Sequence, residues 1–273
     1  MRVTVAPVTA PPTLPAWPYP RWIAHRGAGL LAPENTLAAF RLGASLGYRM
    51  FECDVKLSSD DVPFLLHDDT LERTTSPGTG VPQDGPPHDA IAGAQPWRQL
   101  ATRDAGQWHS SAYAGEAMPT LAQITRFCRA GGHCVNIEIK PTTGTALHTG
   151  AVVAAQAHSL WHGAPVAPLL SSFEVEALQG ARLSAPSLPR ALLLDTLWEG
   201  WLQAALDLHC VALVCNYTLW TPQTVAQAKA AGLRCLSYTV NDEAAAAQLV
   251  AWGTEGIITD RVDHFRPDAP LAT

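Results

Sequence analysis

Short apolar runs alternate with longer amphipathic stretches over most of the chain. The stretches are rich in alanine and place apolar residues three or four positions apart, which is typical of helices. Glycines such as Gly232 and Gly253 follow them, where helices commonly end. Strands that alternate with helices predict a parallel sheet with right-handed crossovers. The runs predicted as strands after residue 120 are His133–Ile139, Pro168–Ser171, Arg190–Leu194, Val211–Cys215, Leu233–Val240 and Gly256–Thr259.

Two earlier runs, Arg21–His25 and Arg49–Val55, extend this series, and the amphipathic segment Thr36–Tyr48 predicts a helix between them. The series then has eight strands, each followed by a helix before the next. Eight such units in a chain of 273 residues predict an α/β fold of the TIM (β/α)8 barrel type. The alternative is an open doubly wound sheet, which is disfavoured because no GxGxxG turn follows the first strand. We expect residues 21–265 to form one barrel domain.

Two segments interrupt the pattern. Residues 74–119 are rich in Gly, Pro, Asp and Gln and predict a small, partly structured insertion after the second strand, with a disordered surface loop as the alternative for residues 76–96. Six prolines fall in the first twenty positions and predict an extended lead-in over residues 1–20. This lead-in has no continuous apolar stretch of the kind found in secretory signals.

Composition narrows the class of protein. Apolar residues make up 47% and charged residues 15% of the chain, which suits a large core and argues against disorder. The net charge of −6 excludes a general nucleic-acid binder. No run of eighteen apolar residues occurs, so no stable membrane insertion is expected. The six cysteines form no CxxC pair and indicate buried thiols in a reduced, cytoplasmic protein.

Apolar and charged residues alternate strictly in the second predicted strand, from Phe51 to Lys56. Side chains alternate across a strand, so Glu52, Asp54 and Lys56 share one face. In an antiparallel sheet this face would simply contact water. In a parallel barrel both faces are covered, so two inward carboxylates are costly unless a cation pairs with them.

The third predicted strand repeats this pattern, with Asn136, Glu138 and Lys140 on one face. Glu138 would add a third inward carboxylate. Three carboxylates without cysteine or paired histidine ligands favour a hard cation, Mg²⁺ or Ca²⁺, with Mn²⁺ as an alternative, over Zn²⁺.

Two histidines stand apart from the other eight because each precedes a polar turn at the end of an apolar run. His25 ends the first predicted strand, and His67 ends the run 63–66. Active sites of barrels lie at the carboxyl ends of the strands, so we expect both histidines to lie there for that reason.

Several short motifs follow one another in a fixed order between residues 22 and 260. In this order and spacing they resemble the glycerophosphodiester phosphodiesterase family. The motifs are His25-Arg26-Gly27, Pro33-Glu34-Asn35-Thr36, Glu52-Cys53-Asp54-Val55, His67-Asp68, Leu71-Glu72-Arg73-Thr74-Thr75, Pro119-Thr120-Leu121, Asn136-Ile137-Glu138-Ile139-Lys140-Pro141, Ser171-Ser172-Phe173, Val240-Asn241 and Gly256-Ile257-Ile258-Thr259-Asp260.

The resemblance implies roles at matching positions. Glu52, Asp54 and Glu138 match the carboxylates that bind the metal, and His25 and His67 match the general acid/base pair. The implied fold is a TIM barrel, with a small insertion after its second strand.

Arg26 and Lys140 match positions that contact the phosphate. Tyr238 departs from the tryptophan that is frequent there and is expected to form part of a pocket wall. The implied activity is metal-dependent hydrolysis of a small-molecule glycerophosphodiester to glycerol 3-phosphate and an alcohol. Three alternatives stay open: a phospholipase D-type enzyme acting on lysophospholipids, a barrel that binds phosphodiesters without cleaving them, and a glycoside hydrolase, which uses paired carboxylates without a metal. The sequence makes no prediction of the oligomeric state.

Overall fold

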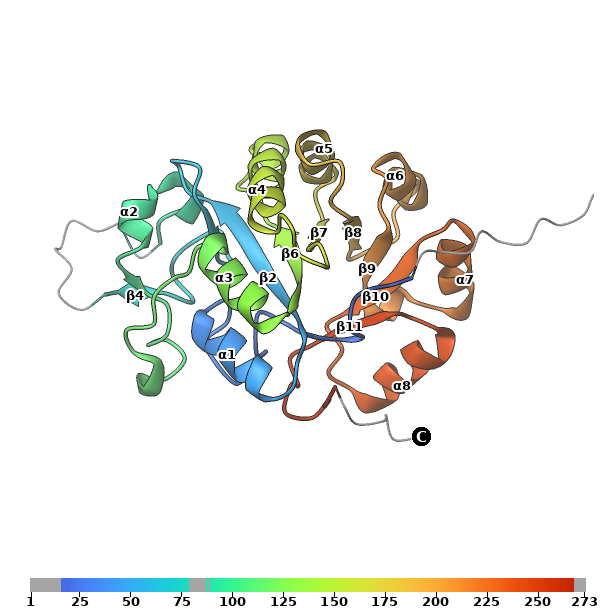
Figure 1. Ribbon diagram of the computed structural model, residues 1–273, viewed down its shortest axis with the longest axis horizontal. Coiled ribbons are helices and arrows are strands. Elements are labelled where there is room, and N and C mark those ends of the chain that lie inside the picture. Colours follow the sequence, from blue (N-terminus) through green and yellow to red (C-terminus); the bar gives the residue numbers. More distant parts are fainter. Residues whose placement is uncertain (1–15, 79–86, 88, 268–273) are drawn as a thin grey trace, which may run out of the picture.

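The computed structural model describes residues 16–78, 87 and 89–267. Its main feature is a closed ring of eight parallel strands with helices on the outside (Figure 1). The ring closes because β1 pairs with β11 on one side and with β2 on the other. The predicted TIM barrel is therefore confirmed, and the open doubly wound sheet is wrong. The parallel strands are β1 (Trp22–Ala24), β2 (Met50–Leu57), β6 (Cys134–Ile139), β7 (Leu169–Ser172), β8 (Arg190–Leu194), β9 (Ala212–Asn216), β10 (Arg234–Tyr238) and β11 (Gly256–Thr259).

Helices connect consecutive barrel strands and cover the outer face of the ring (Figure 1). Thr36 caps the first of them by accepting a hydrogen bond from the Ala39 N–H, so the predicted helix 36–48 begins one residue later and ends at Ser45. The α-helices are α1 (Leu37–Ser45), α2 (Trp97–Leu100), α3 (Leu121–Gly131), α4 (Ala146–Leu160), α5 (Val175–Ser184), α6 (Trp201–Asp207), α7 (Pro222–Ala230) and α8 (Glu243–Trp252). Within the described ranges, none of them is long and apolar enough to cross a bilayer.

The segment between β2 and α3 does not follow the barrel pattern. Strand β3 (Pro63–Leu65) turns back and pairs antiparallel with β2. Two further short strands, β4 (Ser76–Pro77) and β5 (Arg103–Asp104), pair with each other, and α2 lies between them in the sequence. This segment has an apolar cluster of its own, which includes Phe64 and Leu100. Residues 79–86 and 88, part of the stretch for which a disordered loop was the alternative, lie outside the described residues.

The extended lead-in predicted for residues 1–20 lies mostly outside the described residues as well, which begin at Ala16. The assignment of residues 21–265 to a single domain stays a prediction.

The inside of the barrel is apolar at one end and polar at the other. Apolar residues fill the end where the strands begin, among them Ile23, Met50 and Leu236. Further along β2, the inward positions are Glu52 and Asp54, both nearly fully buried. An apolar plug therefore closes one end of the barrel, and polar side chains gather near the carboxyl ends of the strands, where barrel enzymes place their sites.

Helices α4 and α5 pack closely because each has a glycine at their contact. A Cβ atom at Gly150 would collide with the backbone carbonyl oxygen of Ala177, and one at Gly180 would collide with that of Leu147. Alanine favours a helix over glycine by about 1 kcal/mol. Here the clash with a backbone atom outweighs that gain, since the carbonyl group cannot move without shifting the helix.

We therefore expect Gly150→Ala to lower the free energy of unfolding by about 1–3 kcal/mol, the usual cost of overpacking. Thermal and urea unfolding would measure this change. Ser159→Ala, on the exposed side of α4, is the matched control and should leave stability within about 0.5 kcal/mol. An unchanged or raised melting temperature for Gly150→Ala would contradict the close helix contact.

Candidate active site

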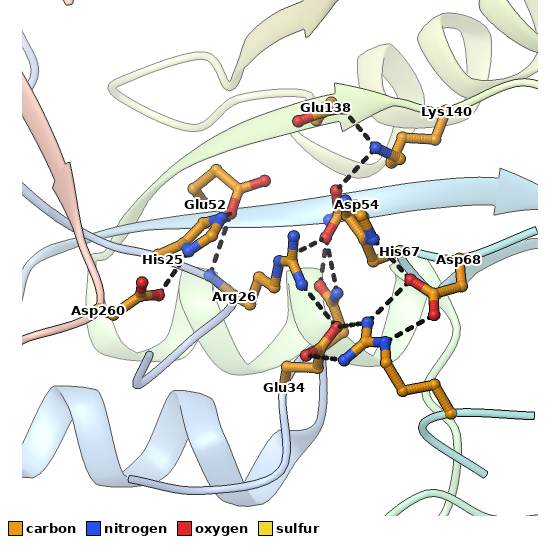
Figure 2. A network of polar contacts seen from close by, with 12 residues as sticks. His25, Arg26, Glu34, Glu52, Asp54, His67, Asp68, Glu138, Lys140 and Asp260 are labelled. Carbon is orange, nitrogen blue, oxygen red and sulfur yellow. Dashed lines mark hydrogen bonds and ion pairs between the residues drawn. The ribbon is translucent and has the colours of Figure 1, made fainter. Parts of the chain in front are cut away.

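Three carboxylates meet near the carboxyl ends of β2 and β6 (Figure 2). One oxygen from each of Glu52, Asp54 and Glu138 lies within 4.8 Å of the others. The strands are in register, with Asp54 opposite Glu138. Alternation along β2 adds Glu52 two residues earlier on the same inner face. The structure thus brings together the three residues predicted as metal ligands.

The surroundings of Glu52 leave part of its charge without a partner. Its Oε2 accepts a hydrogen bond from the Arg26 backbone N–H at 3.0 Å. Its Oε1 is buried and has no hydrogen-bond partner among the described residues. Burial and the charges of Asp54 and Glu138 raise the pKa of Glu52 well above its ordinary value. Burial and the Asp54 charge likewise raise the pKa of Glu138 to about 7.

A divalent cation would satisfy the free oxygen of Glu52 and offset the mutual repulsion of the carboxylates. The donor set consists of carboxylate oxygens alone, which suits Mg²⁺, Ca²⁺ or Mn²⁺. The residues present therefore fit a hard metal ion and could hold one.

Asp54 is the most firmly held of the three carboxylates. Its Oδ2 accepts a hydrogen bond from Asn35 Nδ2 at 2.8 Å, and its backbone N–H donates to Asn35 Oδ1 at 3.1 Å. Arg26 Nε lies 3.3 Å from the same carboxylate. Burial favours a higher pKa, but the positive charges of Arg26 and Lys140 outweigh it and lower the pKa of Asp54. Of the three carboxylates, Asp54 is therefore the one whose surroundings favour the ionised form.

Two cations lie beside the carboxylates and keep part of their side chains open to solvent. Arg26 donates through Nη1 to Glu34 Oε1 at 2.8 Å, and its side chain is 18% exposed. Lys140 donates to Glu138 Oε1 at 3.0 Å and lies 3.9 Å from Asp54 Oδ1. Burial alone would lower the pKa of Lys140, but these two carboxylates raise it. Both predicted phosphate contacts therefore carry a positive charge next to the triad.

His25 lies at the end of β1, as expected. Its Nδ1 is 2.6 Å from Asp260 Oδ1, and its Nε2 is 3.8 Å from Glu52 Oε2. Asn241 Nδ2 donates to the other oxygen of Asp260 at 2.9 Å. Asp260 therefore holds one ring nitrogen of His25 and leaves the other facing the carboxylates (Figure 2).

His67 is held in the same manner from the opposite side of the triad. Its Nδ1 lies 2.7 Å from Asp68 Oδ1. Burial lowers the pKa of His67, and the positive charges of Arg26 and Lys140 act in the same direction. A histidine with a lowered pKa is largely neutral near pH 7 and can accept a proton.

The prediction that His67 lies at the carboxyl end of a barrel strand is wrong. The run that precedes it forms β3, which is not one of the parallel barrel strands and runs antiparallel to β2. The Leu66 N–H donates to the backbone carbonyl of Asp54 at 3.2 Å. This turn back along β2 carries His67 to the level of Asp54, so a hairpin rather than the end of a barrel strand positions it.

Tyr238, on β10, contacts Phe173, the aromatic residue nearest to Lys140. Its hydroxyl donates to the Leu194 carbonyl at 3.0 Å, and its ring meets that of Phe173 edge-on at 5.8 Å. Lys140 Nζ lies 6.0 Å from the centre of the Phe173 ring. Tyr238 thus belongs to an aromatic corner next to the predicted phosphate contact.

Five polar residues of this site were not predicted as site residues. Four of them bind a predicted residue directly through hydrogen bonds, and Arg73 binds two of those four, Glu34 and Asp68. All five lie within the motifs quoted above, but apart from the adjacency of Asp68 to His67 no local pattern links them to the residues they hold. The five are Glu34, Asn35, Asp68, Arg73 and Asp260.

Comparison with known proteins agrees with this geometry. Residues 25–264 match the model of the glycerophosphoryl diester phosphodiesterase family. The chain belongs to this family. The resemblance stated from the motifs and the enzyme class that it implied are confirmed.

Individual members of the family match over nearly the whole chain. A glycerophosphodiester phosphodiesterase of Caldanaerobacter subterraneus is 31% identical over 239 residues, which cover 87% of this chain and 93% of the relative. A phosphodiesterase of Oleispira antarctica, solved in complex with the product sn-glycerol-3-phosphate, has a TM-score of 0.78 and 32% identity, covering 89% of this chain and 93% of the other. A glycerophosphodiester phosphodiesterase of Agrobacterium tumefaciens has a TM-score of 0.72 and 27% identity, covering 89% and 97%.

The raised pKa of Glu52 generates a prediction in which metal affinity and stability change in opposite directions. A carboxyl whose pKa is higher in the folded state costs stability as the pH rises above its unfolded value, so this cost is present at pH 8. Glu52→Gln keeps the shape and removes the charge. We expect the metal-free variant to be at least as stable as the parent at pH 8, and its Mn²⁺ affinity to fall at least ~100-fold, more than the loss of an outer-shell partner costs.

Thermal unfolding without metal and calorimetric titration with Mn²⁺ would measure the two effects. Glu176→Gln, at an exposed position of α5, is the control and should change neither. Undiminished Mn²⁺ binding by Glu52→Gln would remove this residue from the ligand set.

Proposed function

We propose that the protein hydrolyses glycerophosphodiesters to glycerol 3-phosphate and an alcohol, with a carboxylate-bound divalent cation and two histidines that transfer protons. The observation that carries this proposal is the position of His25 and His67 on opposite sides of one carboxylate triad. The sn-glycerol-3-phosphate bound to the Oleispira phosphodiesterase supports a small-molecule substrate of this class.

Glu52, Asp54 and Glu138 would hold the cation, Mg²⁺, Ca²⁺ or Mn²⁺. When bound, such an ion offsets the charge of the diester and polarises its P–O bonds. The triad itself keeps the phosphate-binding cations in place, because Arg26 and Lys140 each lie within ion-pair distance of Asp54.

Arg26 and Lys140 would bind the phosphate oxygens. The guanidinium of Arg26 can donate two parallel hydrogen bonds, whereas the ammonium of Lys140 acts as a compact positive charge. Since both side chains retain exposure of 18% and 20%, they can reach a ligand without leaving their carboxylate partners.

The two histidines would work as a general acid and a general base. A carboxylate holds Nδ1 of each ring, Asp260 for His25 and Asp68 for His67, which leaves Nε2 for the substrate. One imidazole takes a proton from the attacking hydroxyl, and the other gives a proton to the departing alkoxide. Each transfer is worth ~10²–10⁴-fold in rate.

The nucleophile in this proposal is the 2-hydroxyl group of the substrate glycerol. Its oxygen forms a bond to phosphorus, the bond to the alcohol oxygen breaks, and water later opens the cyclic phosphate. Cys53 lies between Glu52 and Asp54 in sequence but packs in the core between strands and helices, and burial raises its pKa well above the ordinary value. It is therefore a poor candidate for a covalent nucleophile.

A reduced, cytoplasmic setting is part of the same proposal. All six cysteines are free thiols, and no disulfide joins them in the described chain. Thiols that are kept reduced are the norm in the cytoplasm.

The first test is incubation of the purified protein with glycerophosphocholine, with and without EDTA. We expect release of sn-glycerol 3-phosphate that EDTA abolishes and that Mg²⁺, Ca²⁺ or Mn²⁺ restores, because the triad needs its cation. A coupled enzymatic assay measures the product. Chelator-resistant cleavage of a glycoside instead would support the rival glycosidase, and substrate left intact with every metal would favour a binding barrel.

Substitution of each histidine separates the acid from the base. His25→Ala and His67→Ala should each lower kcat by ~10²-fold or more on glycerophosphocholine while retaining Mn²⁺ binding. The variant that recovers on a diester with a 4-nitrophenol leaving group lacks the acid, since that group leaves without a proton. His148→Ala, at an exposed ion pair with Asp61, is the control. Equal turnover of glycerol diesters and dialkyl diesters without a neighbouring hydroxyl would refute the cyclic intermediate.

A further inference from the structure

One arginine outside the triad joins two parts of the site that the chain builds from separate segments. Figure 2 shows Glu34, from the loop after β1, and Asp68, from the segment after β3, directed toward the same space. Arg73 lies between them and binds both carboxylates. Its own side chain is 44% exposed, and none of its hydrogen bonds goes to the triad.

The first contact of Arg73 fixes the partner of a histidine. Its Nε donates to Asp68 Oδ2 at 2.6 Å and its Nη2 to Asp68 Oδ1 at 2.8 Å. The same Oδ1 lies 2.7 Å from His67 Nδ1. Arg73 and His67 together hold the pKa of Asp68 well below its usual value, so this carboxylate stays ionised. The plane of Asp68, and with it the His67 ring, is therefore set by Arg73.

The second contact fixes the partner of the predicted phosphate-binding arginine. Arg73 Nη1 donates to Glu34 Oε2 and Nη2 to Glu34 Oε1, both at 2.8 Å. Arg26 Nη1 donates to the same Oε1, also at 2.8 Å. Arg73 thus uses four of its five N–H donors on two carboxylates, in the fork geometry that only a planar guanidinium provides.

The geometry points to Arg73 as a positioning residue that aligns His67 and Arg26 at the same time; this inference rests on the proposed function. Partly exposed ion pairs add little to folding stability. The network would therefore matter for geometry much more than for stability. Without Arg73, Asp68 loses its fixed plane, and Glu34 is left to pair with Arg26 alone, in competition with phosphate.

The test compares Arg73→Met and Arg73→Lys with the parent protein. Arg261→Met is the control, because Arg261 is equally exposed (45%) and pairs with Asp263, which binds none of the site residues named above. Four quantities are measured: kcat on glycerophosphocholine with saturating Mg²⁺, the Kd of sn-glycerol 3-phosphate by calorimetry, the Kd of Mn²⁺, and the melting temperature.

For Arg73→Met we expect kcat to fall ~10–100-fold, less than loss of a histidine would cost. The Kd of sn-glycerol 3-phosphate should rise ~5–10-fold, which corresponds to about 1–1.4 kcal/mol. Mn²⁺ affinity and melting temperature should stay at the parent values. Arg73→Lys should restore less than half of the decrease in log kcat, since lysine restores the positive charge but not the planar, forked set of donors. In Asp68→Asn, the added Arg73→Met should lower kcat by much less than it does alone.

Two results would overturn the inference. One is an Arg73→Met enzyme with kcat and product affinity within twofold of an active parent. The other is a loss of kcat that parallels a loss of Mn²⁺ affinity or melting temperature, because that would make Arg73 a structural residue. Failure of the proposed function is distinguishable, since the unsubstituted protein itself would then show no metal-dependent hydrolysis, and the inference would fall with it.

Discussion

The confinement of three carboxylates in one buried space is the constraint on which the rest of the site depends. Charges of one sign at such short range raise each other's pKa, and a barrel interior offers little water to screen them. Arg26, Lys140 and Asn35 lower that cost around Asp54 but leave an oxygen of Glu52 without a partner. A cation held between the three carboxylates would offset this unbalanced charge.

Three further carboxylates lie around the triad, and they orient its neighbours instead of facing one another. Asp260 and Asp68 each bind the Nδ1 atom of a histidine, and Glu34 binds Nη1 of Arg26. Each of these three side chains thereby keeps its remaining nitrogens for the triad or a ligand. Asp68 is adjacent in sequence to His67 and Glu34 lies eight residues from Arg26, whereas Asp260 and His25 come from opposite ends of the barrel sequence. The barrel strands therefore carry the negative charge of the triad, and residues in the loops orient the histidines and the arginine beside it.

The features of this structure that could be predicted from the sequence are those with a regular spacing of apolar and polar residues. The strands and the inward faces of β2 and β6 follow from alternation, because a buried parallel strand with regular charges has few structural explanations. Hydrogen bonds between loops have no period. Asp260 lies 235 residues from His25, and Arg73 lies 39 residues from Glu34, so no local pattern links them. The antiparallel turn of β3 was hidden for a related reason, because three apolar residues fit either strand direction.

The closure of the barrel between β1 and β11 brings the first and last barrel strands together at the site. Strand β1 shares three residue pairs with β11 but only one with β2, whereas β2 and β6 share six. The carboxylates on β2 and β6 can therefore meet as soon as the first half of the chain has folded. His25 and its partner Asp260 come together only when the last strand has docked on the first. A chain that ended before β11 would contain all three carboxylates of the triad but would lack Asp260, the residue that holds His25 Nδ1.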